Sequence, residues 1–173
     1  EDSTTTEATV GLFEAVRRKH ENLGLAVQAY LYRSARDLER LRPLRPKIRL
    51  VKGAYREPAS VAFPHKPQVD ENYRKLLAYL FENGFLPAVA THDEAMIEFA
   101  KQIVARNGFD PNRFEFQMIL GVRRDLQHAL AAQGYRMRVY VPFGREWLPY
   151  FMRRLAERPA NLAFVLKSLL LER

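Results

Sequence analysis

Short apolar segments alternate along the chain with longer segments in which apolar residues recur every three or four positions. The short segments are typical of buried strands, and the longer ones are typical of amphipathic helices. On this pattern we predict strands at residues 24–29, 48–52, 85–90, 113–118 and 136–141. We predict helices from Thr4 to about Lys19 and over residues 34–41, 69–83, 93–107, 122–133, 145–157 and 160–171.

Capping and breaking residues mark several of these boundaries. The segment from Thr4 to Glu7 has the spacing of a capping box, and Ser34 to Asp37 is predicted to cap the next helix, which Pro43 and Pro46 end. Residues 55–68 contain three prolines and are predicted to form a long loop. A loop of this length in a compact domain is usually functional or mobile.

Regular alternation of strands and helices predicts parallel βα units, so the sheet is either open and doubly wound or closed into a barrel. Polar residues favour the barrel, because they follow each apolar strand at its carboxyl end, where barrel enzymes assemble their active sites. These strand-end residues are Gln28, Lys52, Thr91, His92, Gln117 and Tyr140. No Gly-x-Gly-x-x-Gly segment follows any strand, which disfavours a Rossmann dinucleotide site.

Length and composition are consistent with one domain, residues 1–173, with 47% hydrophobic residues for its core. Five βα units and a terminal helix are too few to close eight strands, so we expect the C-terminal part of a (βα)8 TIM-type barrel. The chain also lacks an initiating methionine, and we expect the upstream part to lie elsewhere.

The net charge of +8 arises from 21 arginines and 7 lysines that are spread without a run. This distribution indicates individual roles for the cations and argues against a nucleic-acid-binding arm. Without cysteine the chain has no disulfide, thiolate nucleophile or zinc–thiolate site, and no metal site is expected. Redox chemistry would therefore require a cofactor. No membrane span, signal peptide or transit peptide is predicted.

One predicted strand carries two cations, Arg49 and Lys52, followed by Gly53 and Tyr55. Three residues apart, the cations should point to opposite faces of a regular strand, and we expect at least one to meet a bound anion. Alternatively, Lys52 reaches solvent at the strand end. Gly53 allows a close backbone approach, and Tyr55 is placed over the mouth of the barrel.

Two further strand ends carry candidate polar groups. Thr91 or Asp93 is predicted to cap the following helix while His92 faces the mouth, where the helix N-terminus favours phosphate; the alternative is an ordinary surface histidine. Glu115 and Gln117 alternate with phenylalanines and share one face of their strand. A buried amide requires a partner, so Gln117 contacts either a ligand or a neighbouring strand.

Near the C-terminus, Tyr150, Arg153, Arg154 and Glu157 fall on one arc of a helix, apart from an apolar arc that includes Trp147. Paired guanidinium groups suit a carboxylate, since each can donate two parallel hydrogen bonds. The alternative is a solvated surface ion pair. The other motifs of the chain decide between a carboxylate-binding site and a surface ion pair.

In combination these segments resemble proline dehydrogenase, a family of flavin enzymes, and most of all its monofunctional bacterial type. The motifs that carry the resemblance are Arg49 to Tyr55, Ala90 to Asp93, Phe114 to Gln117, Arg138 to Pro142 and Tyr150 to Glu157. The resemblance implies a distorted (βα)8 barrel that binds FAD non-covalently at the carboxyl ends of its strands. It also implies oxidation of L-proline to Δ1-pyrroline-5-carboxylate, the first step of proline catabolism, by hydride transfer from C5 of proline to N5 of FAD.

By this resemblance, the substrate carboxylate is bound by Arg153 and Arg154, and the substrate ring is contacted or bordered by Tyr140, Tyr150, Ile119, Ala54 and Tyr55. Arg49, beside the flavin ring, and Tyr140 take the catalytic positions. The residues implied to contact FAD are Gln28, Arg49, Val51, Lys52, Gly53, Ala54, Thr91, His92, Gln117, Arg154 and Glu157. An aspartate and a lysine of the family site are expected to precede Glu1.

The resemblance further implies a quinone as electron acceptor, pyrroline-5-carboxylate dehydrogenase as the downstream enzyme, and a cytoplasmic location with peripheral contact at the bacterial inner membrane. One alternative enzyme class stays open on the residues alone. A barrel lyase or aldolase could use Lys52 to form a Schiff base with a carbonyl substrate. A nucleic-acid-binding role rests only on the net charge and is disfavoured.

Overall fold

Five parallel strands, arranged in the order in which they occur in the sequence, form the framework of the molecule. The computed structural model describes residues 2–145. The strands are β1 (Gly24–Gln28), β2 (Lys47–Val51), β3 (Leu86–Ala90), β4 (Glu115–Ile119) and β5 (Met137–Tyr140). All five predicted strands are therefore present, with ends shifted by one or two residues.

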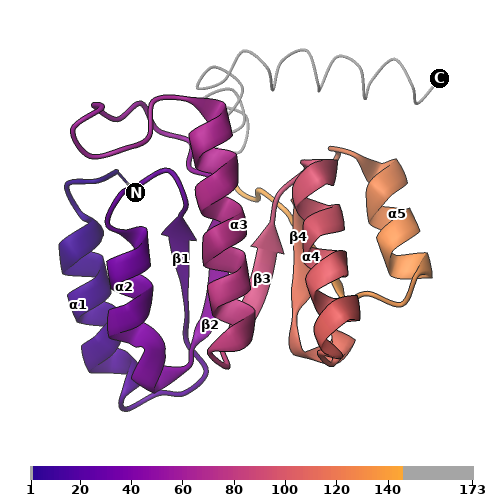
Figure 1. Ribbon diagram of the computed structural model, residues 1–173, viewed down its shortest axis with the longest axis horizontal. Coiled ribbons are helices and arrows are strands. Elements are labelled where there is room, and N and C mark those ends of the chain that lie inside the picture. Colours follow the sequence, from indigo (N-terminus) through magenta and orange to yellow (C-terminus); the bar gives the residue numbers. More distant parts are fainter. Residues whose placement is uncertain (1, 146–173) are drawn as a thin grey trace.

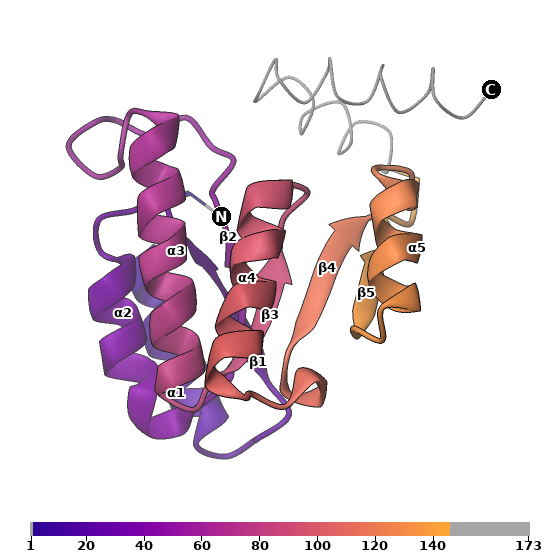
Figure 2. The ribbon, with the colours of Figure 1, turned by 45° about the vertical axis from the view of Figure 1, so that its right-hand side comes forward.

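Helices connect the strands and lie on one face of the sheet (Figure 1; Figure 2). They are α1 (Thr6–Arg17), α2 (Ser34–Leu41), α3 (Lys66–Glu82), α4 (Glu94–Asn107) and α5 (Arg124–Ala132), with short 3-10 turns at Arg42–Leu44 and Pro111–Arg113. Right-handed crossovers between strands in sequential order place α2 to α5 on the same face, and α1, which precedes β1, packs into the same core. This is the arrangement of a βα barrel, and it excludes the doubly wound alternative, in which the strand order reverses.

The core lies between this sheet face and the helices. Alternate strand residues such as Ile48, Leu50, Val89 and Phe116 are fully buried there, and they pack with apolar side chains of α3 and α4. The period of two predicted for the strands is thus confirmed on the helix-facing side. The remaining strand residues face the other way and are available for a site.

The helix starts differ from the sequence predictions. Helix α1 begins at Thr6 without a side-chain cap, because Glu7, the expected capping-box partner, instead contacts Arg33 and Arg40. Helix α2 also lacks a side-chain cap, since the hydroxyl of Ser34 donates to the Gln28 carbonyl at 2.5 Å. Both predicted caps were wrong because the capping side chains have other partners: distant arginines for Glu7 and the carbonyl of the preceding strand end for Ser34.

Helix α3 begins at Lys66, within the segment predicted to be loop. Pro67 stands in its first turn, where the missing N–H would have no intrahelical partner, so the proline starts the helix rather than excluding it. The predicted helices 145–157 and 160–171 lie outside the described residues. Within residues 2–145, no helix is long and apolar enough to cross a membrane. One domain over residues 1–173 stays a prediction.

Candidate active site

The sheet face away from the helices brings together candidate residues from four strands. In the printed register Ala26 pairs with Arg49, Arg49 with Ala88, and Ala88 with Glu115. Strand residues two positions apart share a face. The same face therefore carries the predicted contact residues Gln28, Arg49, Val51, Gln117, Ile119 and Tyr140. We call it the inner face.

Arg49 stands near the middle of the inner face and is exposed there. Its guanidinium carbon lies 5.5 Å from the ring centroid of Tyr140, a cation–π contact that links β2 with β5. Both neighbouring inner-face residues in the register are alanines, Ala26 and Ala88. The two residues predicted to be catalytic are thus in contact with each other.

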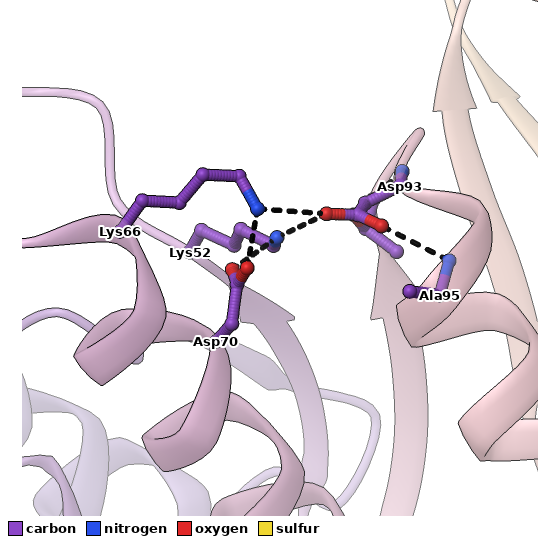
Figure 3. Close-up of polar contacts among 6 residues, drawn as sticks. Lys52, Lys66, Asp70, Asp93 and Ala95 are labelled. Atoms are coloured by element: carbon purple, nitrogen blue, oxygen red, sulfur yellow. Dashed lines mark hydrogen bonds and ion pairs between the residues drawn. The ribbon is translucent and has the colours of Figure 1, made fainter.

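Lys52 takes the opposite side, as the three-residue spacing from Arg49 predicted. Figure 3 shows Lys52 and Lys66 reaching the carboxylates of Asp70 on α3 and Asp93 at the start of α4. The Lys52 ammonium lies 2.5 Å from Asp93 Oδ2 and also contacts Asp70. Lys52 does meet anions, as predicted, but these are the carboxylates of Asp70 and Asp93 in the protein itself.

The carboxyl groups of Asp70 and Asp93 both have pKa values below their ordinary value. Burial raises their pKa values, but the hydrogen bonds and charges of Lys52 and its neighbours together outweigh burial, so that the pKa values of Asp70 and Asp93 are lowered. Asp93 also accepts a hydrogen bond from the Ala95 N–H at 3.0 Å, which confirms it as the cap of α4. Lys52 therefore ties the end of β2 to the first turns of two helices. The Lys52 ammonium is directed to two carboxylates of the helices and away from the inner face, which disfavours a Schiff-base role.

Gly53 adopts a φ of +109°, and a Cβ built on it would lie 2.2 Å from Cδ1 of Tyr30. The predicted close approach is confirmed, and its partner is this aromatic ring. The hydroxyl of Tyr30 donates to Glu57, and Glu57 also accepts the N–H and the hydroxyl of Ser3 at 2.7 and 2.6 Å. These contacts anchor the loop that carries Ala54 and Tyr55 to the N-terminal segment.

His92 joins the carboxyl ends of β3 and β4. Its Nε2 accepts a hydrogen bond from the Ile119 N–H at 3.1 Å, which requires the neutral ring. Burial, followed by the charges of Arg123 and Arg49, lowers the pKa of His92 to about 4. Thr91 is buried, and its hydroxyl accepts from the Asp93 N–H at 3.1 Å. The ordinary surface histidine is thereby excluded, although contact with a ligand stays a prediction.

Glu115 is a site residue whose importance the sequence pattern did not reveal. Its carboxylate is 4% exposed and forms 2.7 Å ion pairs with Lys47 and Arg138, and it accepts from Gln117 Nε2 at 2.6 Å. Burial raises the pKa of Glu115, but hydrogen bonds from Arg138, Lys47 and Gln117 outweigh it and lower the pKa to about 2. The available signal was an acidic residue between two buried phenylalanines.

The remaining predicted residues, Tyr150, Arg153, Arg154 and Glu157, lie outside the described part of the chain. Among residues 2–145, no group of three histidine, aspartate or glutamate side chains is placed to hold a metal ion. The described chemistry is that of a face with an exposed arginine, amides and an aromatic ring, bordered by strand ends fixed by ion pairs and a neutral histidine.

Comparison with known proteins supplies a family for this arrangement. The family model described as proline dehydrogenase matches residues 1–167. Proline dehydrogenase 1 of Bacillus subtilis subsp. natto is 50% identical over 170 residues, which are 98% of this chain and 56% of that protein. Proline dehydrogenase of Deinococcus radiodurans is 49% identical over 172 residues, with the same coverage. The chain thus spans about half the length of the curated relatives that it matches.

Solved structures of larger proteins contain the same fold. Proline utilization A of Bdellovibrio bacteriovorus, inactivated by N-propargylglycine, superposes with a TM-score of 0.83 at 27% identity, over 90% of this chain and 19% of that one. A mutant of proline utilization A from Bradyrhizobium japonicum gives a TM-score of 0.82 at 27% identity, over 97% of this chain and 20% of that one. The five-strand unit therefore corresponds to a part of these larger chains.

Proposed function

The chain belongs to the proline dehydrogenase family, and on that premise we propose that the full-length protein oxidises L-proline to Δ1-pyrroline-5-carboxylate with bound FAD. The observation that carries the proposal is the inner face. There the exposed Arg49 contacts Tyr140, and the candidate residues from neighbouring strands converge beside it.

The described residues fit a flavin on chemical grounds. A flat, polar ring system requires hydrogen-bonding groups around its edge and room above the surface on which it lies. Gln28, Arg49 and Gln117 offer such groups on the inner face, and the strand between β2 and β4 contributes only the short Ala90 beside Gln117. Thr91 and His92 follow at the end of that strand. We assign these residues, with Val51, Gly53, Ala54 and Lys52 at the end of β2, to the FAD site.

When bound, FAD supplies the oxidising chemistry by accepting the electrons and hydrogen that leave the substrate. The chain's own residues provide binding, orientation and charge. The positive charge of Arg49 stabilises negative charge that develops beside it during the reaction, and the neighbouring Tyr140 ring restricts the positions of its guanidinium group. Neutral His92 holds the end of β4, and with it Ile119, at a fixed place near the substrate.

The substrate end of the site is assigned to residues that follow β5, together with Ile119 of β4 and Tyr55 of the loop after β2. Arg153 and Arg154 bind the proline carboxylate, Tyr150 and Ile119 contact the ring, Tyr55 borders it, and Glu157 restrains the arginine pair and contacts FAD. A carboxylate held by two guanidinium groups is fixed in direction as well as position. The reacting carbon is then held in one orientation, which lowers the entropic cost of the reaction.

Partners follow from the same proposal. Electrons leave toward a quinone at the membrane surface, which places the protein in the cytoplasm with peripheral contact at the inner membrane. The product passes to a pyrroline-5-carboxylate dehydrogenase as the downstream enzyme.

Turnover of the full-length protein tests the proposal. L-proline should drive reduction of an artificial electron acceptor in the presence of FAD, with formation of Δ1-pyrroline-5-carboxylate. Borohydride treatment with substrate should leave Lys52 unmodified. A protein that takes up no FAD and is labelled at Lys52 would instead be a Schiff-base lyase.

A further inference from the structure

A single buried carboxylate on the inner face organises side chains from three strands. Glu115 on β4 contacts Lys47 of β2, Arg138 of β5 and Gln117 of its own strand. The ion pair with Lys47 joins strands that are separated by β3, and it passes diagonally beside Ala88, the short, fully buried inner-face residue that pairs with Glu115. Arg138 approaches with two nitrogens, Nε at 2.7 Å and Nη2 at 3.0 Å from the two carboxylate oxygens.

The contact with Gln117 has a consequence for its orientation. A carboxylate only accepts hydrogen bonds, so the NH2 end of the Gln117 amide must face it, as the 2.6 Å distance from Nε2 to Glu115 Oε1 records. The amide oxygen is then directed away from Glu115. Ionisation of Glu115 persists at any ordinary working pH because its cationic and amide partners lower its pKa to about 2.

We propose that Glu115 is a positioning residue for the cofactor site, which fixes the Gln117 amide so that its oxygen accepts a hydrogen bond from an N–H or O–H group of bound FAD. This inference rests on the proposed function, because it takes FAD as the ligand of the inner face. Both the ring imide and the ribityl hydroxyls of a flavin are donors of this class. The bidentate contact with Arg138 and the ion pair with Lys47 keep the carboxylate itself in place.

The contacts of Glu115 with Lys47, Arg138 and Gln117 allow a positioning role to be tested separately from a purely structural role. Lys47 contributes an ion pair of the same 2.7 Å length as Arg138, yet the structure records no hydrogen bond between Lys47 and Gln117. Lys47→Met therefore removes part of the stabilisation of Glu115 and leaves the amide contact intact. Gln117→Met retains a similar side-chain volume and removes the acceptor.

The experiment measures FAD affinity of the full-length apoprotein for the wild type, Gln117→Met, Glu115→Met and the double variant, together with their thermal unfolding. Loss of one ligand hydrogen bond should weaken FAD binding about fivefold in Gln117→Met. Glu115→Met should weaken it by about the same factor, since it acts through the same bond. The double variant should bind FAD no more than about twofold more weakly than either single variant, instead of the further loss of about fivefold expected for independent effects.

Lys47→Met is the matched control and should lower thermal stability without changing FAD affinity by more than about twofold. If Glu115→Met does not fold, Glu115→Gln replaces it. The single amide oxygen of that variant is shared by Arg138, Lys47 and Gln117, and a loss of FAD affinity of about threefold to fivefold is expected. FAD affinity unchanged by either Glu115 substitution, or additive losses in the double variant, would overturn the positioning role alone. A wild-type protein that binds no FAD would overturn the proposed function as well.

Discussion

Replacement of Lys52 by methionine is the substitution for which the structure gives the clearest energetic expectation. The Lys52 side chain is 10% exposed, and its partners Asp70 and Asp93 are 13% and 26% exposed. Removing one member of a buried ion pair typically costs 3–5 kcal/mol, because the other charge stays buried without compensation. Lys66 still contacts Asp70, and Asp93 still accepts from the Ala95 N–H. We therefore expect Lys52→Met to lower the free energy of unfolding by about 3 kcal/mol, near the lower end of this range.

A matched control lies on the same helix as Asp70. Lys75 pairs with Glu71 at 2.6 Å, but both side chains are about two-thirds exposed, at 68% and 64%. Lys75→Met removes an equal charge and should cost no more than about 0.5 kcal/mol. Urea unfolding of the full-length apoprotein would measure both free energies of unfolding without a contribution from FAD binding. Equal losses of stability in Lys52→Met and Lys75→Met would refute a special contribution of the ion pairs between Lys52 and the two aspartates.

The pH dependence provides a second test of the same reasoning. The pKa values of Asp70 and Asp93 are lowered below their ordinary value of 3.8, so the stability that they gain from Lys52 is complete well above that pH. It is lost as the pH falls through the lowered pKa values and the carboxylates become protonated. The difference between wild type and Lys52→Met should therefore be constant near neutral pH and shrink below pH 3.8. A difference that does not change with pH would contradict this origin.

Three further predictions follow from single positions. Gly53→Ala should lower the free energy of unfolding by about 3 kcal/mol in urea titration, since the added Cβ meets the Tyr30 ring. Gly121→Ala, also at positive φ but with open space around it, should cost about 1 kcal/mol. Equal costs in the two variants would contradict the close approach at Gly53. Because folding lowers the pKa of His92 from 6.5 to about 4, the unfolded chain takes up that proton first, and stability should fall as the pH drops across this interval. In His92→Gln, the amide oxygen can still accept the backbone N–H, but the fall in stability between pH 6.5 and about 4 should be smaller than in the wild type. An unchanged dependence of stability on pH would exclude His92 as its source. Arg153→Lys and Arg154→Lys should raise the KM for L-proline at least about tenfold in steady-state kinetics, because a lysine cannot donate two parallel hydrogen bonds; an unchanged KM in both would refute the carboxylate clamp.

Periodicity made the strands and their faces predictable from the sequence. Alternation places Arg49 and Lys52 on opposite faces and Glu115 and Gln117 on one face, and the structure confirms both relations. The sequential strand order that distinguishes a barrel from a doubly wound sheet was anticipated from polar residues at strand ends. These features depend on local geometry, which the chain encodes within a few residues.

Long-range electrostatic partners were not predictable in the same way. Glu7 has the spacing of a capping-box residue, yet Arg33 and Arg40 from the next helix take it instead. Lys52 finds Asp70 and Asp93 from two different helices, 18 and 41 positions away, which no local pattern specifies. Such partners emerge only when strand order and helix placement are known. The arginine pair after β5 stays a sequence prediction.

The most direct test of the account is an anaerobic titration of the full-length protein with L-proline while the visible absorbance of its bound flavin is recorded. The account predicts that the purified protein carries or takes up FAD and that L-proline bleaches the flavin band, with Δ1-pyrroline-5-carboxylate as the product. A protein that binds FAD but whose absorbance is unchanged by L-proline, or one that binds no flavin, would contradict it.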